Sequence, residues 1–578
     1  GLADPKGYLE RLRQEAGAEC YITVEKILGK GEHLPADWPI SGTTGYEFIA
    51  SLAEVLVDDE KMDTLRQAWD EVVGKTSDPH AELRAARRLM VDRNFAGEFA
   101  TLLGLANVIA RDEPLQPDEE TLRHALRELL LAFPVYRTYG TEAGLPPADL
   151  RLLQQVIAQV DADAQALDLL TRIMTGAVVN QAQANSFRTR FQQLTGPLMA
   201  KSVEDTLFFR QNMGLALNEV GAEPVPRGFS LTRFHQEMAT RRERQPDALS
   251  GTSTHDTKRG EDARARLYTL TEAPTQWAEG VARWRQMNQT HVRFLNDGTA
   301  PKAADTWMLY QALAGVWPPA LRPDDHAGLK ALETRFLEFV EKALREAKLR
   351  TDWVDSNEAY ETVVLEYARH LLSAENQTFL TDFCDSLQPF IRAGLVNSLS
   401  QTLIKLTAPG VPDIYQGSEA LNFSLVDPDN RREPDYPRLA QQLRDADRNV
   451  FNQEASWRSG QVNQFVTATL LRLRQDKPAL FRRGDYVALI THGEQAEKAI
   501  AFARTDGNDA VIVVAPRLVF AAASYTGAAL WSETSVALPE PLAGRRYRDL
   551  FTEEVFALND TLELASAQWC WRVLVACD

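Results

Sequence analysis

At residues 249–267 the sequence is Leu249-Ser-Gly-Thr-Ser-Thr-His-Asp-Thr-Lys-Arg-Gly-Glu-Asp-Ala-Arg-Ala-Arg-Leu267. Its first part predicts a short strand, and its last part, with Arg264, predicts a helix. The polar residues between them follow one another too closely for a continued strand. They favour one of two structures. The first is a loop that binds a polar ligand such as a sugar, with Asp256 accepting hydrogen bonds from hydroxyl groups. The second is a helix cap formed by Thr254 or Asp256.

A carboxylate lies near the end of another predicted strand. Residues 20–28 are rich in β-branched and aromatic side chains, which is typical of a buried strand, and Glu25 follows its apolar part. At the mouth of a barrel, partial burial would raise the pKa of this carboxyl group and suit it to general acid catalysis. The alternative is an ordinary charged residue at a solvent-exposed strand end, because unpaired buried carboxylates are rare.

Further along the chain, aromatic rings accompany polar groups. The segment Gly410–Glu419 contains Tyr415, and the following segment Asp427–Arg432 contains Asp429 and Arg431. Planar polar groups beside an aromatic ring suit the hydroxyls and the apolar face of a sugar. The alternative is a turn-rich loop with surface ion pairs.

A fourth segment, Phe133–Tyr139, places Arg137 between Tyr136 and Tyr139. Two tyrosines around an arginine are able to stack on sugar rings. The alternative is a junction between a helix and a loop that buries its aromatic side chains.

The composition excludes several classes of protein. The 578 residues are 44% hydrophobic and 25% charged, as in ordinary globular proteins. The net charge of −18 argues against a nucleic-acid binder, which would carry a basic face. No apolar run approaches the roughly 18 residues of a membrane span, and no signal peptide is recognised. Four cysteines without a C-x-x-C pair indicate a cytoplasmic protein, and the scattered histidines indicate no metal site.

The periodicity of apolar residues divides the chain further. Helical spacing appears in residues 153–160 and again in residues 322–348. From about residue 464, short strand-like runs alternate with Gly, Asp and Asn turns, which predicts a small antiparallel β-domain. The predicted strands are residues 486–490, 498–504, 510–515 and 569–575.

In their order and amino-acid sequence, these segments resemble the maltooligosyltrehalose synthase family, part of the α-amylase superfamily of glycoside hydrolases. Residues 253–267 are similar to its S-T-H-D-T-K-R-x-E-D-x-R-A-R-L motif, with Gly260 where Ser is common. Residues 24–28 are similar to its general-acid strand. The family's F-Y-R-Y segment is Phe208-Phe-Arg-Gln here, so two tyrosine positions differ. Other similar segments are residues 133–139, 217–221, 348–353, 357–360 and 412–432.

The resemblance implies an α/β fold. It would be the C-terminal part of a (β/α)8 TIM barrel, strands 5–8, with large helical insertions and a C-terminal antiparallel β-sandwich. The implied parts are 1–51 (barrel segment with the acid/base strand), 52–217 (helical insertion), 218–275 (barrel segment with the third carboxylate), 276–395 (helical insertion), 396–463 (last barrel strand and helix) and 464–578 (β-domain).

The beginning of the chain is similar to the segment that follows the family's R-x-D-H-I-D-G-L motif. The first Asp of R-x-D-H is the family's nucleophile, so the nucleophile and the first four strands would precede Gly1. The chain also begins without an initiator methionine. We therefore expect a fragment or processed product, and a missing N-terminal barrel half in the full-length protein.

The resemblance also implies the roles of residues. Glu25 would be the general acid/base and Asp256 the transition-state stabiliser. Substrate-binding residues would be His255, Lys258 and Arg259, at the rim of the site, with Tyr136, Arg137, Tyr415, Asp429 and Arg431. The reaction would be an isomerisation that converts the reducing-end α-1,4 linkage of a maltooligosaccharide to α,α-1,1, without metal or organic cofactor. Two alternatives stay open: a hydrolase or glucanotransferase of the same superfamily, and a non-catalytic maltooligosaccharide-binding protein.

Overall fold

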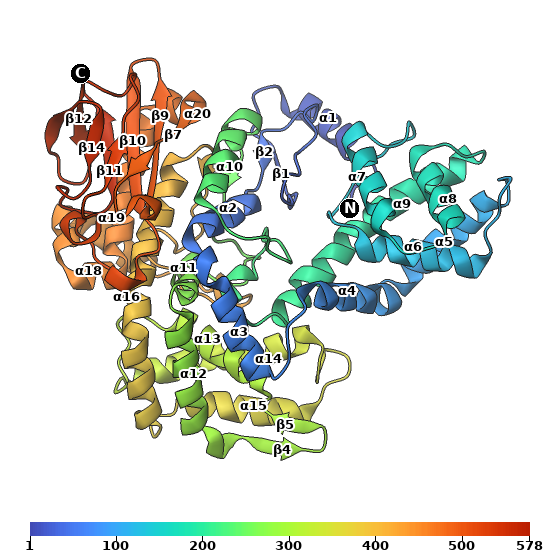
Figure 1. Cartoon of the computed structure of the whole chain (residues 1–578), viewed down its shortest axis with the longest axis horizontal. Coiled ribbons are helices and arrows are strands. Elements are labelled where there is room, and N and C mark those ends of the chain that lie inside the picture. Colours follow the sequence, from blue (N-terminus) through green and yellow to red (C-terminus); the bar gives the residue numbers. More distant parts are fainter. Residues whose placement is uncertain (578) are drawn as a thin grey trace. The chain divides into compact units, whose positions relative to one another are not determined.

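The computed structural model describes residues 1–577 and divides into two compact units (Figure 1). Unit 1 contains residues 1–22, 27–40 and 78–210. Unit 2 contains residues 23–26, 41–77 and the chain from 211 onward. No helix among the described residues has both the length and the apolar character that crossing a membrane requires.

Unit 1 is helical, as the apolar periodicity of this region predicts. Its α-helices are α1 (Pro5–Ala16), α4 (Pro79–Leu89), α5 (Ala96–Ala110), α6 (Glu119–Ala132), α7 (Pro147–Gln159), α8 (Ala164–Thr175) and α9 (Gln181–Met199). Asp4, Asp78, Asp118 and Asp163 cap four of them by accepting a backbone N–H of the first turn. Leucine and phenylalanine side chains from α5, α6, α8 and α9 form one buried core.

Unit 2 contains four short parallel strands that are far apart in sequence. They are β1 (Thr23–Val24), β2 (Gly42–Thr43), β3 (Leu249–Ser250) and β6 (Val411–Pro412). β1 pairs with β2 and β3 pairs with β6, both in parallel. The strand predicted over residues 20–28 is therefore shorter than expected, because only two of its residues pair with a neighbouring strand.

Close backbone contacts join the two strand pairs. A Cβ atom on Gly42 would lie 2.5 Å from the Cβ of Ala248, and one on Gly45 would lie 2.1 Å from the carbonyl oxygen of Leu249. Gly45 also has a φ of +97°, which favours glycine. From Gly42 to Gly45 the first segment moves along the second from Ala248 to Leu249, so the two segments run in the same direction. Since each strand pair is itself parallel, all four strands share one direction. Their carboxyl ends, where α/β proteins commonly place functional groups, therefore lie on one side.

The remaining helices of unit 2 follow and separate these strands. They are α2 (Tyr46–Leu56), α3 (Met62–Val73), α10 (Leu231–Arg244), α11 (Glu261–Tyr268), α12 (Pro274–Met287), α13 (Ala303–Val316), α14 (His326–Ala347), α15 (Glu358–Leu371), α16 (Gln377–Thr407), α17 (Tyr436–Asp445), α18 (Glu454–Ser459), α19 (Gln461–Asp476), α20 (Pro478–Arg483) and α21 (Gly527–Leu530). A hairpin of β4 (Arg293–Leu295) and β5 (Gly298–Ala300) lies between α12 and α13 in the chain. The helix expected in residues 322–348 begins later, at His326, because Asp325 caps it.

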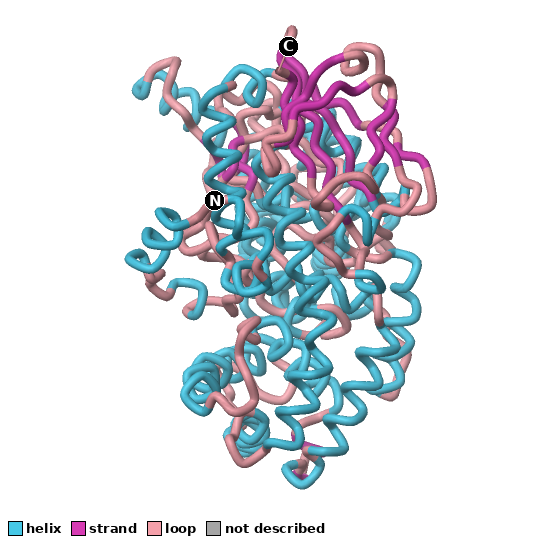
Figure 2. The backbone as a smooth tube through the Cα atoms, turned by 90° about the vertical axis from the view of Figure 1, so that its left-hand side faces the viewer, coloured by secondary structure: helices cyan, strands magenta, loops and turns pink. Residues whose placement is uncertain are grey.

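Most strand residues belong to the C-terminal part of unit 2 (Figure 2). One antiparallel sheet has the order β13-β12-β15-β10-β9-β7, and a second has the order β14-β11-β8. The antiparallel pairing predicted for this region is confirmed. The strands are β7 (Asp485–Ala488), β8 (Thr491–His492), β9 (Ala499–Asp506), β10 (Asp509–Pro516), β11 (Ser535–Ala537), β12 (Arg545–Asp549), β13 (Val555–Leu558), β14 (Thr561–Glu563) and β15 (Arg572–Ala576).

Helix α16 connects this β-domain to the parallel strands. The hydroxyl of Ser400 donates to the carbonyl oxygen of Pro516 at 2.7 Å, and the indole of Trp571 donates to Ser400 at 3.0 Å. The C-terminal end of α16 leads directly to β6. The helix therefore fixes the last parallel strand to the β-domain inside one unit.

Candidate functional site

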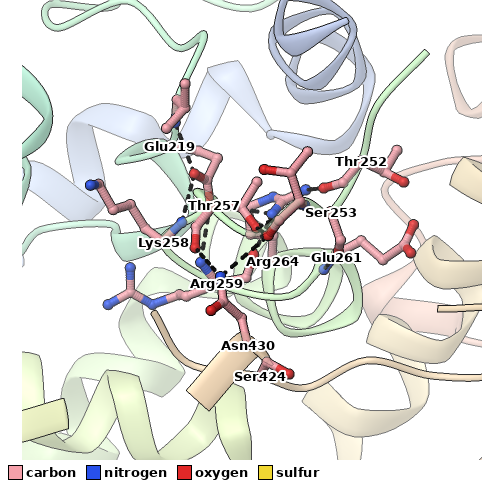
Figure 3. Close-up of polar contacts among 12 residues, drawn as sticks. Glu219, Thr252, Ser253, Thr257, Lys258, Arg259, Glu261, Arg264, Ser424 and Asn430 are labelled. Carbon is pink, nitrogen blue, oxygen red and sulfur yellow. Dashed lines mark hydrogen bonds and ion pairs between the residues drawn. The ribbon is translucent and has the colours of Figure 1, made fainter. Parts of the chain in front are cut away.

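The polar loop Ser253–Arg259 lies between β3 and α11, as the sequence predicts (Figure 3). His255 and Asp256 are its exposed residues, with side chains 55% and 48% exposed. The imidazole Nε2 of His255 lies 3.2 Å from a carboxylate oxygen of Asp256. Most of the loop is buried, and its tip presents a carboxylate to solvent.

A buried carboxylate, Glu219, holds one end of the loop. The backbone N–H groups of Lys258 and Arg259 donate to its two oxygens at 2.8 and 3.2 Å. The guanidinium of Arg264 adds an ion pair at 3.2 Å. Glu219 is only 1% exposed, so these are charge-assisted contacts that water does not replace (Figure 3).

A buried amide, Asn430, holds the other side of the loop. Its side-chain nitrogen donates to the carbonyl oxygens of Thr254, His255 and Thr257 at 3.2, 2.8 and 3.3 Å. Asn430 lies in the 3-10 helix η8 (Asp429–Arg431) and is 5% exposed. The segments 254–257 and 429–431, which the sequence separates widely, are thus in direct contact.

The other predicted catalytic carboxylate, Glu25, follows β1 directly and is exposed. Tyr46, at the start of α2, contacts Thr254 of the loop through a hydrogen bond of 2.9 Å between their hydroxyl groups. Burial is the main cause that raises the pKa of Tyr46, and the charges of Asp256 and Glu25 raise it further. The charges of both predicted catalytic carboxylates therefore raise the pKa of the same phenol.

Lys258 and Arg259, which the resemblance places at the rim of the sugar-binding site, are only 8% and 6% exposed. Burial lowers the pKa of Arg259 to about 10, and its guanidinium lies over the ring of Phe339. They turn inward because Glu219 binds their backbone N–H groups and fixes the direction of the chain there.

The predicted residues after β6 lie beside the loop. The hydroxyl of Tyr415 donates to the carbonyl oxygen of Asn430 at 3.0 Å. Asp429 is buried, and Arg335 binds both of its oxygens, at 2.7 and 3.0 Å. Burial alone would raise the pKa of Asp429, but its hydrogen bonds with Arg335 lower it below its usual value. Arg431 is exposed and pairs with Asp427 at 2.6 Å.

Tyr136 and Arg137 belong to unit 1, whereas the other eight predicted site residues belong to unit 2. The hydroxyl of Tyr136 donates to the carboxylate of Glu204. Arg137 donates to the carbonyl oxygen of Leu2 at 2.5 Å and lies over the ring of Tyr139. Within their own unit, these side chains are engaged with other parts of the protein.

Sequence reasoning did not select Glu219 or Asn430 as site residues. The segment 217–221 resembles the family, and Glu219 is its only charged residue. A single acid between Leu217 and Val220 is the pattern that could have indicated a buried charge. The structure also explains Gly260. A Cβ atom there would lie 2.4 Å from the amide oxygen of Asn422, so the close approach of this segment leaves no room for a side chain.

The residues that the structure describes include no cluster of three or more His, Cys, Asp or Glu side chains suited to a metal ion. The four cysteines are free thiols. The chemistry available at the site is that of carboxylates, imidazole and hydroxyl groups.

Comparisons with known proteins point to one family. No family model matches the sequence. Two Mycobacterium tuberculosis proteins, from strains CDC 1551 and H37Rv, carry the name maltooligosyl trehalose synthase. Each is 32% identical to the chain over 542 residues, which is 93% of this chain and 64% of theirs. Over the region that it spans, the chain is similar to maltooligosyltrehalose synthases.

Solved structures of maltooligosyltrehalose synthases show the same similarity. That from Arthrobacter ramosus has a TM-score of 0.82 and 29% identity, over 100% of this chain and 69% of that one. A Sulfolobus tokodaii protein described as a hypothetical maltooligosyl trehalose synthase has a TM-score of 0.77 and 25% identity, over 99% of this chain and 68% of that one. The chain therefore has the fold of these proteins, and it spans less than two thirds of the length of the Mycobacterium relatives.

Proposed function

We propose that the protein isomerises maltooligosaccharides, converting the reducing-end α-1,4 linkage into an α,α-1,1 linkage. One observation carries the proposal: Glu25 and Asp256 follow two parallel strands, and the charges of both act on the phenol of Tyr46. Similarity to maltooligosyltrehalose synthases supports the substrate class. We also propose that β1, β2, β3 and β6 are strands 5–8 of an α-amylase-type barrel.

In the proposed reaction, a nucleophilic carboxylate of the family's type attacks the anomeric carbon of the second-last glucose unit. Glu25, as a carboxylic acid, gives its proton to the glycosidic oxygen while the bond between that oxygen and the anomeric carbon breaks. The freed glucose stays in the site and turns. Its own anomeric hydroxyl then attacks the glycosyl-enzyme, and the Glu25 carboxylate takes the proton. The new linkage is α,α-1,1, and the nucleophile is released.

We assign Asp256 to the transition state of both steps. Its carboxylate accepts hydrogen bonds from ring hydroxyls and offsets the positive charge that develops at the anomeric centre. His255, Tyr415 and Arg431 are proposed sugar contacts at the same edge. Lys258, Arg259 and Asp429 are proposed to support the site through their buried charges. Tyr136 and Arg137 stay predictions for a sugar contact in unit 1.

The test uses the polypeptide as its host makes it, incubated with maltohexaose. We expect reducing ends to disappear with little release of glucose. New reducing ends would instead identify a hydrolase. Glucanotransfer would change the chain lengths while the number of reducing ends stays constant. Binding of maltohexaose without turnover would leave only a binding protein. Each of these three results would overturn the proposal.

A further inference from the structure

We propose that Glu219 and Asn430 are positioning residues, which together fix the backbone of the loop Ser253–Arg259 and so aim Asp256 at the sugar. This inference rests on the proposed function for its catalytic meaning. Its structural part, that two distant side chains determine the shape of the loop, stands on the contacts alone.

The loop needs such support because its backbone has little regular pairing. The N–H of Thr257 reaches the carbonyl oxygen of Thr254 only at 3.4 Å. Buried backbone groups without partners are costly, so side chains have to satisfy them. Glu219 accepts from the N–H groups of Lys258 and Arg259, and Asn430 donates to carbonyl groups on both sides of Asp256.

The two residues are complementary in chemistry. Glu219 offers only acceptors to N–H donors, and the amide nitrogen of Asn430 offers only donors to carbonyl oxygens. Asp256 lies between His255 and Thr257, whose carbonyl groups Asn430 binds, and its own N–H donates to the hydroxyl of Thr254 at 3.1 Å. Tyr46 contacts that same hydroxyl at 2.9 Å and is a third, weaker support. None of these three supporting side chains is exposed, so each acts on the sugar only through the loop.

Two nearly isosteric variants reverse this chemistry. Glu219→Gln places an amide nitrogen against an N–H or a guanidinium donor. Asn430→Asp places a carboxylate against three carbonyl oxygens. For both we expect kcat on maltohexaose to fall on the order of 100-fold with KM nearly unchanged, because a small misplacement of a transition-state group acts mainly on the chemical step. Hydrogen–deuterium exchange of the backbone in residues 254–259 should rise in parallel. Tyr46→Phe, which removes one hydroxyl and should fold normally, should give a several-fold fall in kcat.

The matched control is Glu361→Gln. Glu361, on α15, is also a buried glutamate, 5% exposed, and it accepts hydrogen bonds from Arg345 and Thr351. We expect this variant to lower thermal stability without changing loop exchange or the ratio of kcat to KM. If it lowers kcat as much as Glu219→Gln does, the effect is general destabilisation and the inference fails.

Two other results would overturn the inference: unchanged exchange at 254–259 in both variants, or raised exchange with an unchanged kcat. A wild-type protein without turnover would refute the proposed function instead. The exchange measurement would then still decide whether Glu219 and Asn430 fix the loop.

Discussion

The Ser253–Arg259 loop of unit 2 and the Phe133–Tyr139 segment of unit 1 use their polar groups in opposite ways. In the loop, distant side chains bind the backbone, and the carboxylate of Asp256 stays 48% exposed. In the segment, the side chains themselves are engaged, since Tyr136 donates to Glu204 and Arg137 to Leu2. Both segments contain charged and hydroxyl-bearing side chains. A candidate catalytic loop is therefore distinguished by contacts that leave its reactive side chain exposed to solvent.

The largest effect is expected at Glu25, whose charge, like that of Asp256, raises the pKa of Tyr46. Glu25→Gln should lower turnover of maltohexaose by about 10²–10⁴-fold, because an amide cannot donate and accept the proton of general acid–base catalysis. The free energy of unfolding should change by no more than about 0.5 kcal/mol, since the side chain is exposed. Reducing-end assays and urea unfolding measure the two quantities. A near-normal rate would remove Glu25 from the mechanism.

Asp256→Asn should have the next largest effect. Loss of the negative charge should lower kcat on the order of 10²–10³-fold, because the charge at the anomeric centre is then no longer offset. The exposed position again predicts an unchanged unfolding transition. Steady-state kinetics with maltohexaose, beside a melting curve, make the test. A fall in stability with little loss of kcat would show that Asp256 serves the fold of the loop and not the transition state.

The two regions should also differ in their response to pH. Burial and the charge of Glu261 raise the pKa of Asp262, in the first turn of the helix that follows the loop, to about 7. The folded state therefore keeps a proton that the unfolded state loses above its ordinary pKa of 3.8. The resulting stabilisation is fully present below about pH 4 and is lost as the pH rises to 7. Tyr136, whose pKa lies well above 10 because it is buried, does not titrate there.

Urea unfolding of the wild type between pH 4.5 and 7.5 should therefore show a free energy of unfolding that falls as the pH rises. In Asp262→Asn this slope should be smaller, while Tyr136→Phe should keep it. An equal slope in Asp262→Asn would mean that another group is responsible for the dependence.

The smallest effect is expected in unit 1. Tyr136→Phe keeps the ring but removes the hydroxyl that donates to Glu204, so it should cost about 1 kcal/mol of stability. Binding of maltohexaose should be unchanged, because a phenyl ring still stacks on a sugar. Tyr8→Phe is the matched control, since Tyr8 is 43% exposed in the same unit. If Tyr136→Phe left stability unchanged and weakened binding, the hydroxyl would serve the sugar, and the contrast between the two regions would disappear.

Local pattern was sufficient for much of this protein. The runs predicted as strands at 498–504 and 510–515 are the antiparallel neighbours β9 and β10. The family resemblance carried by residues 253–267 agrees with the comparisons. These successes have a common reason: apolar periodicity, turn residues and motifs are properties of neighbouring residues.

Only the tertiary structure decided how the candidate site is held. Glu219 lies 39 residues before Lys258, and Asn430 lies 175 residues after His255, so no local pattern relates them to the loop. In the same way, Tyr136 and Glu204 are 68 residues apart, and nothing in the segment 133–139 indicates that pairing. By itself the sequence predicted many of the elements, a resemblance to maltooligosyltrehalose synthases, and Glu25 and Asp256 as candidate catalytic residues. The fold decided which polar groups are buried as supports, because a buried polar group must find its partner wherever packing places one.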